Sequence, residues 1–132
     1  MKKSFTLIEI LVVTTIIVLL TSIAAVSYSQ FSKSSRDARR KTDLEQLRAA
    51  LEMYRSNNDT YPVGNWSNLS VLTTTYIQSL PTDPKSTSYS YYYSGAVNDY
   101  TVGSYLESGG TSCVAAGCTV DCNYCLGPYG QK

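Results

Sequence analysis

The feature that most constrains this sequence is an uninterrupted apolar run near its N-terminus, from residue 5 to residue 26. The run contains one charged residue, Glu9, and neither proline nor glycine. Its 22 residues would form a helix of roughly 33 Å, long enough to cross the hydrocarbon core of a bilayer. Lys2 and Lys3 precede it, so the positive-inside rule places the N-terminus in the cytoplasm and the rest outside. We expect a membrane-spanning helix; a secretory signal cleaved near residues 24–27 is the lesser alternative, because signal cores are shorter.

Glu9 is the second informative feature, because a carboxylate inside a membrane helix is costly and requires a partner. The simplest interpretation is that Glu9, about one turn into the helix, reaches the headgroup region. The functional interpretation is that assembly supplies a positive charge. Cleavage between Ser4 and Phe5 would create an α-amine at Phe5, and a neighbouring chain shifted by about one turn would pair that amine with Glu9.

The residues around Glu9 also carry a family resemblance. The basic leader Lys2-Lys3-Ser4, followed by Phe5-Thr6-Leu7-Ile8-Glu9 and the apolar run, resembles the class III signal of type IV pilins and type II secretion pseudopilins. The resemblance implies that a prepilin peptidase cuts between Ser4 and Phe5, that Phe5 becomes N-methylated, and that Glu9 guides subunits into a helical filament. Ser4 stands where relatives usually have glycine, which predicts slower cleavage, and the proline that many relatives carry late in the run is absent.

A second helical pattern follows the apolar run without interruption. No proline or glycine occurs from residue 27 until Pro62. Apolar residues recur at spacings of 3, 4 and 3 on one helix face, namely Leu44, Leu47, Leu51 and Tyr54. The sequence Asn57-Asn58-Asp59 favours a turn and ends the pattern. We predict a leader at residues 1–4 and one helix over residues 5–57, apolar over 5–26 and amphipathic over 27–57.

Charge and composition exclude several functions. The formal net charge is +1 and there is no histidine, so neither a strongly basic nucleic-acid binder nor a histidine-based catalytic or zinc site fits. The basic cluster from Arg36 to Lys41 could bind nucleic acid or anionic lipid, but we favour a solvated helix face that pairs with acidic surfaces of neighbouring copies. We find no nucleophile–base pair and no glycine-rich phosphate loop, so we expect no enzyme activity and no specific nucleic-acid partner.

Residues 58–132 have the composition of a small β-rich domain. Residues 69–72 predict a helical turn capped by Ser67 or Asn68. Residues 88–94 and 100–107 predict two antiparallel strands joined by a turn at 95–99. Two strands alone are marginal, so a third strand or the helix must cover one face. The expected fold class is α+β, with the sheet packed on the leucine face of the long helix.

Tyrosine is over-represented, with 12 tyrosines against 2 phenylalanines and 1 tryptophan. Six of them fall in or beside the predicted strands: Tyr89, Tyr91, Tyr92, Tyr93, Tyr100 and Tyr105. They could form an exposed aromatic surface for glycans or a protein, which would make the chain a monomeric membrane-anchored binding domain. We favour the other interpretation, in which half of them line the core and half face solvent as ordinary strand formers.

Four cysteines lie in the glycine-rich segment 109–132, namely Cys113, Cys118, Cys122 and Cys125. In an exported chain an even number of clustered cysteines predicts two disulfides, and all three pairings stay open. A four-cysteine zinc site is the lesser alternative, because only Cys122 and Cys125 have the paired spacing. A redox-active pair at those two positions is less favoured still, since no thioredoxin-like pattern surrounds them. We expect disulfides that staple a tail with few apolar residues.

The family resemblance also bears on metals. Major pseudopilins often hold calcium in a loop beside their strands, through carboxylates and carbonyls. The carboxylates available for such a site here are Asp83, Asp99, Glu107 and Asp121, although no run matches an EF-hand loop. We expect no cofactor, with calcium as the alternative.

The resulting hypothesis is a structural subunit of a type IV pilus or a related filament. It implies a homo-oligomeric helical filament built through residues 5–26, after prepilin peptidase cleavage and with an inner-membrane platform and ATPase. The chain would lie in the cytoplasmic membrane before assembly and in a pilus on the cell surface afterwards. A type II secretion pseudopilin is the alternative within the family. The cysteine-rich C-terminus favours the pilus, because secretion pseudopilins usually lack one.

Overall fold

One long helix dominates the fold. The computed structural model describes residues 5–113 and 122–132, and its helix α1 spans Leu7–Asn58. Thr6 caps the N-terminus, since its Oγ1 accepts a hydrogen bond from the backbone N–H of Glu9 at 3.4 Å. At the other end Asp59 is left-handed, with φ 61°, and its N–H donates to the Arg55 carbonyl at 2.8 Å. The predicted helix is confirmed, but it begins two residues later than Phe5 because Thr6 forms the cap.

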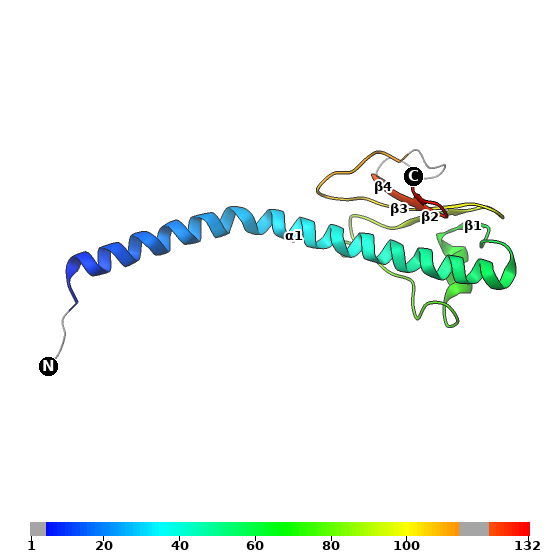
Figure 1. The fold of residues 1–132 in the computed structure, drawn as a ribbon, viewed down its shortest axis with the longest axis horizontal. Helices are drawn as coiled ribbons and strands as arrows, with labels where there is room; N and C mark the ends of the chain where they lie inside the picture. The colour runs from blue at the N-terminus through cyan, green and yellow to red at the C-terminus, as the bar shows by residue number, and fades with distance from the viewer. Residues whose placement is uncertain (1–4, 114–121) are drawn as a thin grey trace.

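The two halves of α1 have different surroundings. Figure 1 shows the first half extending away from the rest of the chain in a gentle curve, while the second half lies along the sheet. Large apolar side chains between Phe5 and Ile23 are 48–83% exposed, whereas the leucines of the second half are fully buried. The change from an all-apolar to an amphipathic sequence therefore coincides with the change from a free helix to a packed one.

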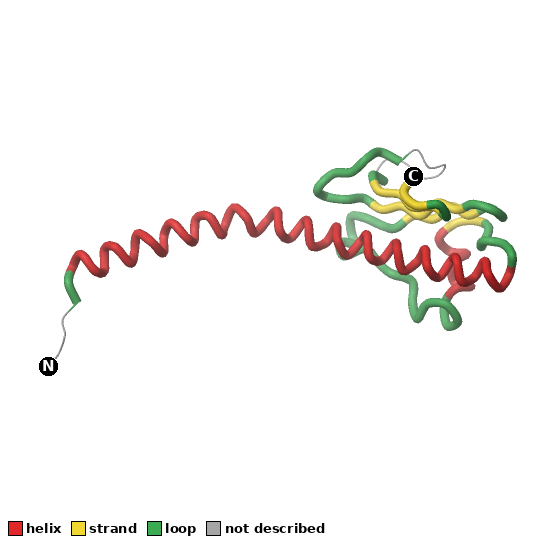
Figure 2. Tube along the Cα trace, viewed as in Figure 1, coloured by secondary structure: helices red, strands yellow, loops and turns green. Residues whose placement is uncertain are grey.

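The globular part is a five-stranded antiparallel sheet whose order follows the chain (Figure 2). Its strands are β1 (Gly64–Asn65), β2 (Tyr92–Gly95), β3 (Tyr100–Ser104), β4 (Tyr124–Gly127) and β5 (Gly130–Gln131). A 3-10 helix, η1 (Trp66–Leu72), follows β1. In the register of the central pair, Tyr93 lies opposite Val102. The α+β class and the antiparallel pairing of the two predicted strands are confirmed.

Both predicted strands are shorter than expected, and three strands were not predicted. The first predicted strand loses its beginning to a turn, because the N–H groups of Ser88 and Tyr89 both donate to the Lys85 carbonyl. The second ends at Ser104, after which the Leu106 N–H donates to the side-chain oxygen of Asn123 at 2.6 Å. Strand β4 lies in the cysteine-rich segment, where glycine and polar residues conceal a short strand buried between β3 and β5.

The core lies between α1 and the sheet. Leu44, Leu47 and Leu51 are completely buried against tyrosine, leucine and valine side chains from η1 and strands β2 to β4. Each such leucine contributes about 1.5–3 kcal/mol by leaving water. Tyr54 lies at the edge of this cluster. The predicted packing of the sheet on the leucine face is therefore confirmed.

The helical turn predicted at residues 69–72 is the second half of η1, but its cap is neither Ser67 nor Asn68. Asn65 is the N-cap: its side-chain oxygen accepts from the Ser67 N–H at 3.1 Å. Asn68 completes a reciprocal capping box by accepting from the Asn65 N–H at 3.1 Å. The predicted cap was therefore two or three positions too late, since several neighbouring polar residues can each act as a cap.

The tyrosines of the sheet region belong to the core and do not form an exposed aromatic surface. Tyr91, Tyr93 and Tyr100 are buried, and the other three are half-buried. The buried hydroxyls reach acceptors: Tyr91 donates to Asp43 at 2.6 Å and Tyr93 to the Pro62 carbonyl at 2.6 Å. This arrangement supports the core interpretation and removes the observation on which the monomeric binding domain depended.

The cysteine-rich segment is stapled by a disulfide between Cys113 and Cys125. Cys125 lies in β4, so the bond ties the loop that follows β3 back to the sheet. Cys122 is also disulfide-bonded, and Cys118 lies outside the described residues. The expected disulfides are thus confirmed for the described cysteines. The zinc site and the Cys122–Cys125 redox pair are both wrong, because the Cys125 sulfur is bonded to Cys113.

We predict that replacing Cys113 and Cys125 together by serine lowers the free energy of unfolding by about 2–4 kcal/mol, because it frees a loop in the unfolded chain that the bond otherwise closes. Urea unfolding of the full chain in detergent measures this change. The matched control is Ser112→Ala, an exposed neighbour, which should shift stability by less than about 0.5 kcal/mol. Equal stability of the double variant and the control would show that the staple is dispensable.

Candidate functional site

The first part of the site is the apolar half of α1, residues 7–26. By length and composition α1 is able to cross a membrane, and none of its most apolar stretch is buried by the rest of the chain. Ser4 lies outside the described residues, and Phe5 is 75% exposed just before the helix. An apolar surface of this size on all sides of a helix requires lipid or other protein around it.

Polar groups within this half of α1 are satisfied internally. The hydroxyls of Thr14 and Thr15 donate to the carbonyls of Leu11 and Val12 at 2.9 and 2.8 Å. Thr21 donates to the Ile17 carbonyl at 2.9 Å in the same way. Because these hydroxyls already have acceptors one turn back, the helix can enter an apolar environment without leaving them unpaired.

Glu9 is the exception. It occupies the first turn of α1, where its backbone N–H reaches Thr6 and the positive end of the helix dipole favours its charge. No side chain among residues 5–113 and 122–132 forms an ion pair with its carboxylate. A carboxylate in an apolar segment with no counter-charge in the described chain is the arrangement expected when a separate molecule supplies the partner.

The second part of the site fixes α1 to the globular part through Arg40. Its side chain is 0% exposed and donates two hydrogen bonds to Asp83, from Nε to Oδ2 at 2.7 Å and from Nη2 to Oδ1 at 2.9 Å. Its Nη1 also donates to Asp37 at 2.8 Å and to Glu107 at 3.0 Å. A planar guanidinium suits this role because its donors are held in a fixed fork.

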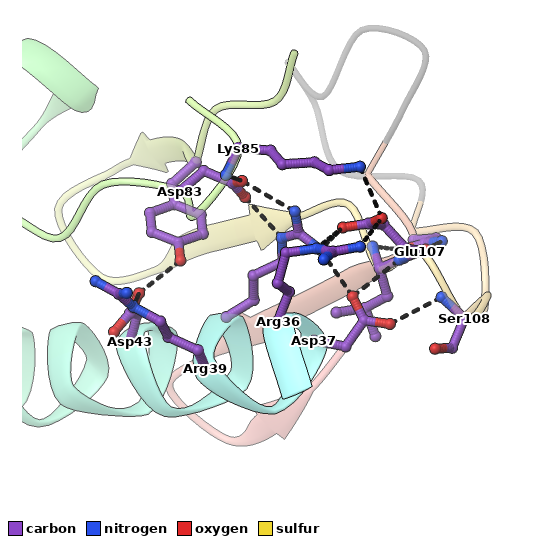
Figure 3. Close-up of polar contacts among 12 residues, drawn as sticks. Arg36, Asp37, Arg39, Asp43, Asp83, Lys85, Glu107 and Ser108 are labelled. Atoms are coloured by element: carbon purple, nitrogen blue, oxygen red, sulfur yellow. Dashed lines mark hydrogen bonds and ion pairs between the residues drawn. The ribbon is translucent and has the colours of Figure 1, made fainter. Parts of the chain in front are cut away.

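Glu107 is the second centre of this network. Arg36 binds it bidentately, with Nε and Nη2 each 2.7 Å from a carboxylate oxygen, and the Lys85 ammonium lies 3.1 Å from Oε2. Figure 3 shows Asp83, Lys85 and Glu107 gathered over the side of α1 that carries Arg36 and Asp37. We call the six residues the Arg40 cluster: Arg36, Asp37, Arg40, Asp83, Lys85 and Glu107.

The Arg40 cluster corrects the interpretation of the basic segment. The segment from Arg36 to Lys41 was expected to be a solvated helix face, yet Asp37 and Arg40 are buried, while Arg39 and Lys41 are exposed. The burial of Asp37 and Arg40 could have been predicted from the sequence, because positions 37 and 40 continue the leucine face of the helix at helical spacing. Their partners were not predictable, since Asp83 lies 43 residues away in the sequence.

Hydrogen bonds within the cluster lower the pKa values of two of its carboxyl groups, Glu107 and Asp37. The hydrogen bonds from Arg36 keep the pKa of Glu107 well below its ordinary value, against the opposing effect of burial. Burial alone would raise the pKa of Asp37, but backbone N–H groups of Glu107 and Ser108 at 2.9 and 2.8 Å outweigh it and lower that pKa overall.

These pKa shifts predict acid sensitivity. Both carboxyl groups have folded-state pKa values below their unfolded values, so their stabilisation is complete above an ordinary carboxyl pKa and is lost as the pH falls below it. We expect the free energy of unfolding to decline steadily below about pH 4.5. Urea unfolding between neutral and acid pH measures this decline. Glu107→Gln should be less stable at neutral pH and show a shallower decline; an unchanged slope in that variant would contradict the assignment.

Three of the four carboxylates considered for calcium are already bound by cations of the chain itself. Asp83 is bound by Arg40 and Glu107 by Arg36, Arg40 and Lys85. Asp99 is bound by the Lys132 ammonium through both oxygens, at 2.9 and 2.8 Å. Asp121 lies outside the described residues. Oxygens already occupied by the chain's own cations are poor ligands for a divalent ion, so the described residues offer no ready calcium site.

An exposed apolar helix half, continued by an amphipathic half that carries an antiparallel sheet, defines a pilin-like subunit. Residues 28–117 match the family described as type II secretion system (T2SS), protein G, and this chain belongs to that family. The type II secretion system core protein G of Vibrio cholerae serotype O1 (strain ATCC 39315 / El Tor Inaba N16961) is 29% identical over 125 residues, which cover 83% of this chain and 85% of that protein. No solved structure is a significant match.

These relatives favour the secretion pseudopilin over the type IV pilus subunit that we expected first. The expectation of a pilus subunit depended on the cysteine-rich C-terminus. The family match ends at residue 117, so Cys118, Cys122 and Cys125 lie beyond the matched part. Membership of a pseudopilin family also agrees with membrane anchoring and with a structural role.

Proposed function

We propose that this chain is the filament-forming pseudopilin of a type II secretion system. In this role prepilin peptidase cleaves between Ser4 and Phe5, the new N-terminus at Phe5 is methylated, and subunits leave the cytoplasmic membrane to form a short helical filament. The apolar half of α1 forms the filament core, and the sheet with its disulfide-bonded tail forms the outside. The chain acts as a structural subunit and catalyses no reaction.

The observation that supports this proposal most is the unburied apolar half of α1 in a chain of the secretion protein G family. A single membrane-anchored domain needs a helix of about 20 residues and no more. Here α1 continues through the membrane length into a packed second half without a break. Such a rigid connection transmits the position of the apolar half directly to the globular part, which a polymerising subunit requires and a flexibly tethered domain does not.

Glu9 and Phe5 have paired roles in this proposal. A neighbouring subunit shifted by about one helical turn brings its Phe5 α-amine to the Glu9 carboxylate, which has no ion-pair partner among the described residues. The partners of the chain are therefore further copies of itself, prepilin peptidase, and the inner-membrane platform and ATPase of the secretion machinery. Nucleic acid is not among them, since the chain carries a formal net charge of only +1.

Deletion of the gene in its own host tests this function. We expect the deletion to stop the release of secreted proteins into the medium and to leave long surface fibres intact. Complementation with the unaltered gene should restore release. Loss of long surface fibres with normal secretion would contradict the proposal and assign the chain to a type IV pilus.

A further inference from the structure

We propose that the Arg40 guanidinium is the built-in cross-linking cation of this domain, so that the segments carrying Asp37, Asp83 and Glu107 are joined without a bound divalent metal. The proposal concerns how the globular part is held together. It stands whether the filament serves secretion or a pilus.

Three segments of the chain converge on the Arg40 side chain. Three carboxylates from three separate segments meet one cation: Asp37 from α1, Asp83 from the loop before β2, and Glu107 from the loop after β3. The donor–acceptor distances lie between 2.7 and 3.0 Å, and the guanidinium also lies 5.4 Å from the centre of the Tyr89 ring. Joining carboxylates from distant segments is what a bound calcium ion does in other proteins. Here a side chain of the chain itself does it.

The carboxylate oxygens around Arg40 have no free position for a metal ion. Every carboxylate oxygen at this position already accepts at least one hydrogen bond. Those of Asp83 accept from Arg40 and from the Lys85 N–H, and those of Asp37 accept from Arg40 and from the Glu107 and Ser108 N–H groups. Those of Glu107 accept from Arg36, Arg40 and Lys85. A divalent ion would have to displace a buried guanidinium that cannot lose its proton.

The charges of the Arg40 cluster are balanced. The cluster contains three cationic side chains and three carboxylates, so it is neutral as it stands. Adding a divalent cation would leave two positive charges uncompensated in a buried position, which is unfavourable. Asp99 is likewise bound by a cation of the chain itself: the Lys132 ammonium binds its carboxylate and also donates to the Tyr100 carbonyl at 3.0 Å.

Thermal unfolding of the full chain in detergent, with calcium or with excess EDTA, tests the proposal. Calcium at about 10 mM is roughly ten times the dissociation constant of weak extracellular calcium modules, so a bound ion would raise the midpoint temperature by roughly 5 °C or more. We expect the two midpoints to agree to within about 1 °C, since the carboxylates of the Arg40 cluster are already bound by the chain's own cations. A saturable rise with calcium, or a fall with EDTA, would overturn the proposal.

A pair of variants tests the position of the cation. Arg40→Ala removes the guanidinium from the three carboxylates, and Arg39→Ala removes the same group from an exposed neighbour on the same helix. We expect a large fall in the midpoint for Arg40→Ala alone, and a partial recovery when calcium is added, because the freed carboxylates can then ligate it. A midpoint equal to that of Arg39→Ala, or a loss that calcium leaves unchanged, would overturn the assignment of the guanidinium to a cation position.

Discussion

Replacing Glu9 by alanine is expected to leave the chain in the membrane and to reduce filament yield about a hundredfold or more. Removing one partner of a buried ion pair costs about 3–5 kcal/mol, and roughly 1.4 kcal/mol corresponds to a factor of ten. Membrane insertion should not be impaired, because placing alanine in an apolar segment costs less free energy than placing a carboxylate there. The measurement is the amount of subunit in sedimented filaments, compared with the amount in the membrane fraction.

Glu45→Ala is the matched control for this experiment. Glu45 is an acidic residue of the same helix, but its side chain is 51% exposed and its contact with Arg48 at 3.4 Å lies at the surface. Its loss should change filament yield by less than roughly twofold, since surface pairs contribute little. Normal yield from the Glu9 variant would contradict the assembly role, and an equal loss from both variants would show that the effect is not specific to Glu9.

Replacing Arg40 by methionine is expected to lower the free energy of unfolding by about 3–5 kcal/mol, because it leaves Asp37 and Asp83 buried without their main counter-charge. The free energy of unfolding of a small domain is only about 5–15 kcal/mol, so the variant should be close to unfolding at physiological temperature. Methionine keeps most of the side-chain length, which separates the lost charge from a cavity. Urea unfolding of the full chain measures the change.

Arg39→Met is the control for Arg40→Met. Arg39 is 65% exposed, and its nearest acidic contact, to Asp43, is 4.0 Å long. We expect a loss of less than about 1 kcal/mol, as for other surface pairs. If the two variants unfold at the same urea concentration, the Arg40 cluster is not what joins α1 to the globular part.

The long helix was predictable from the sequence because its signals are local. The spacing of Leu44, Leu47 and Leu51 defines the buried face, and the run of three turn-forming residues from Asn57 marks the end of α1. The membrane-length apolar run is a signal of the same kind. Patterns that repeat within one or two turns depend on neighbours in the sequence, and these are present before any tertiary structure forms.

The parts that were missed depend on contacts between distant residues. Nothing near Arg40 in the sequence indicates that Asp83 and Glu107 will surround it, since they lie 43 and 67 residues away. Strand β4 was hidden for a similar reason: its burial comes from pairing with β3 and β5, and its four residues have no alternating pattern of their own. The pairing of Cys113 with Cys125 is likewise set by the position of β4 beside the preceding loop.

The mass of the N-terminal peptide, taken from filaments assembled in the native host, tests the central claim most directly. The account predicts a peptide that begins at N-methylated Phe5, which places a free α-amine where the Glu9 carboxylate of a neighbouring subunit can bind it. A peptide that begins at Met1 would contradict the account, because an uncut leader offers no amine at Phe5 and leaves Glu9 without the partner that assembly requires.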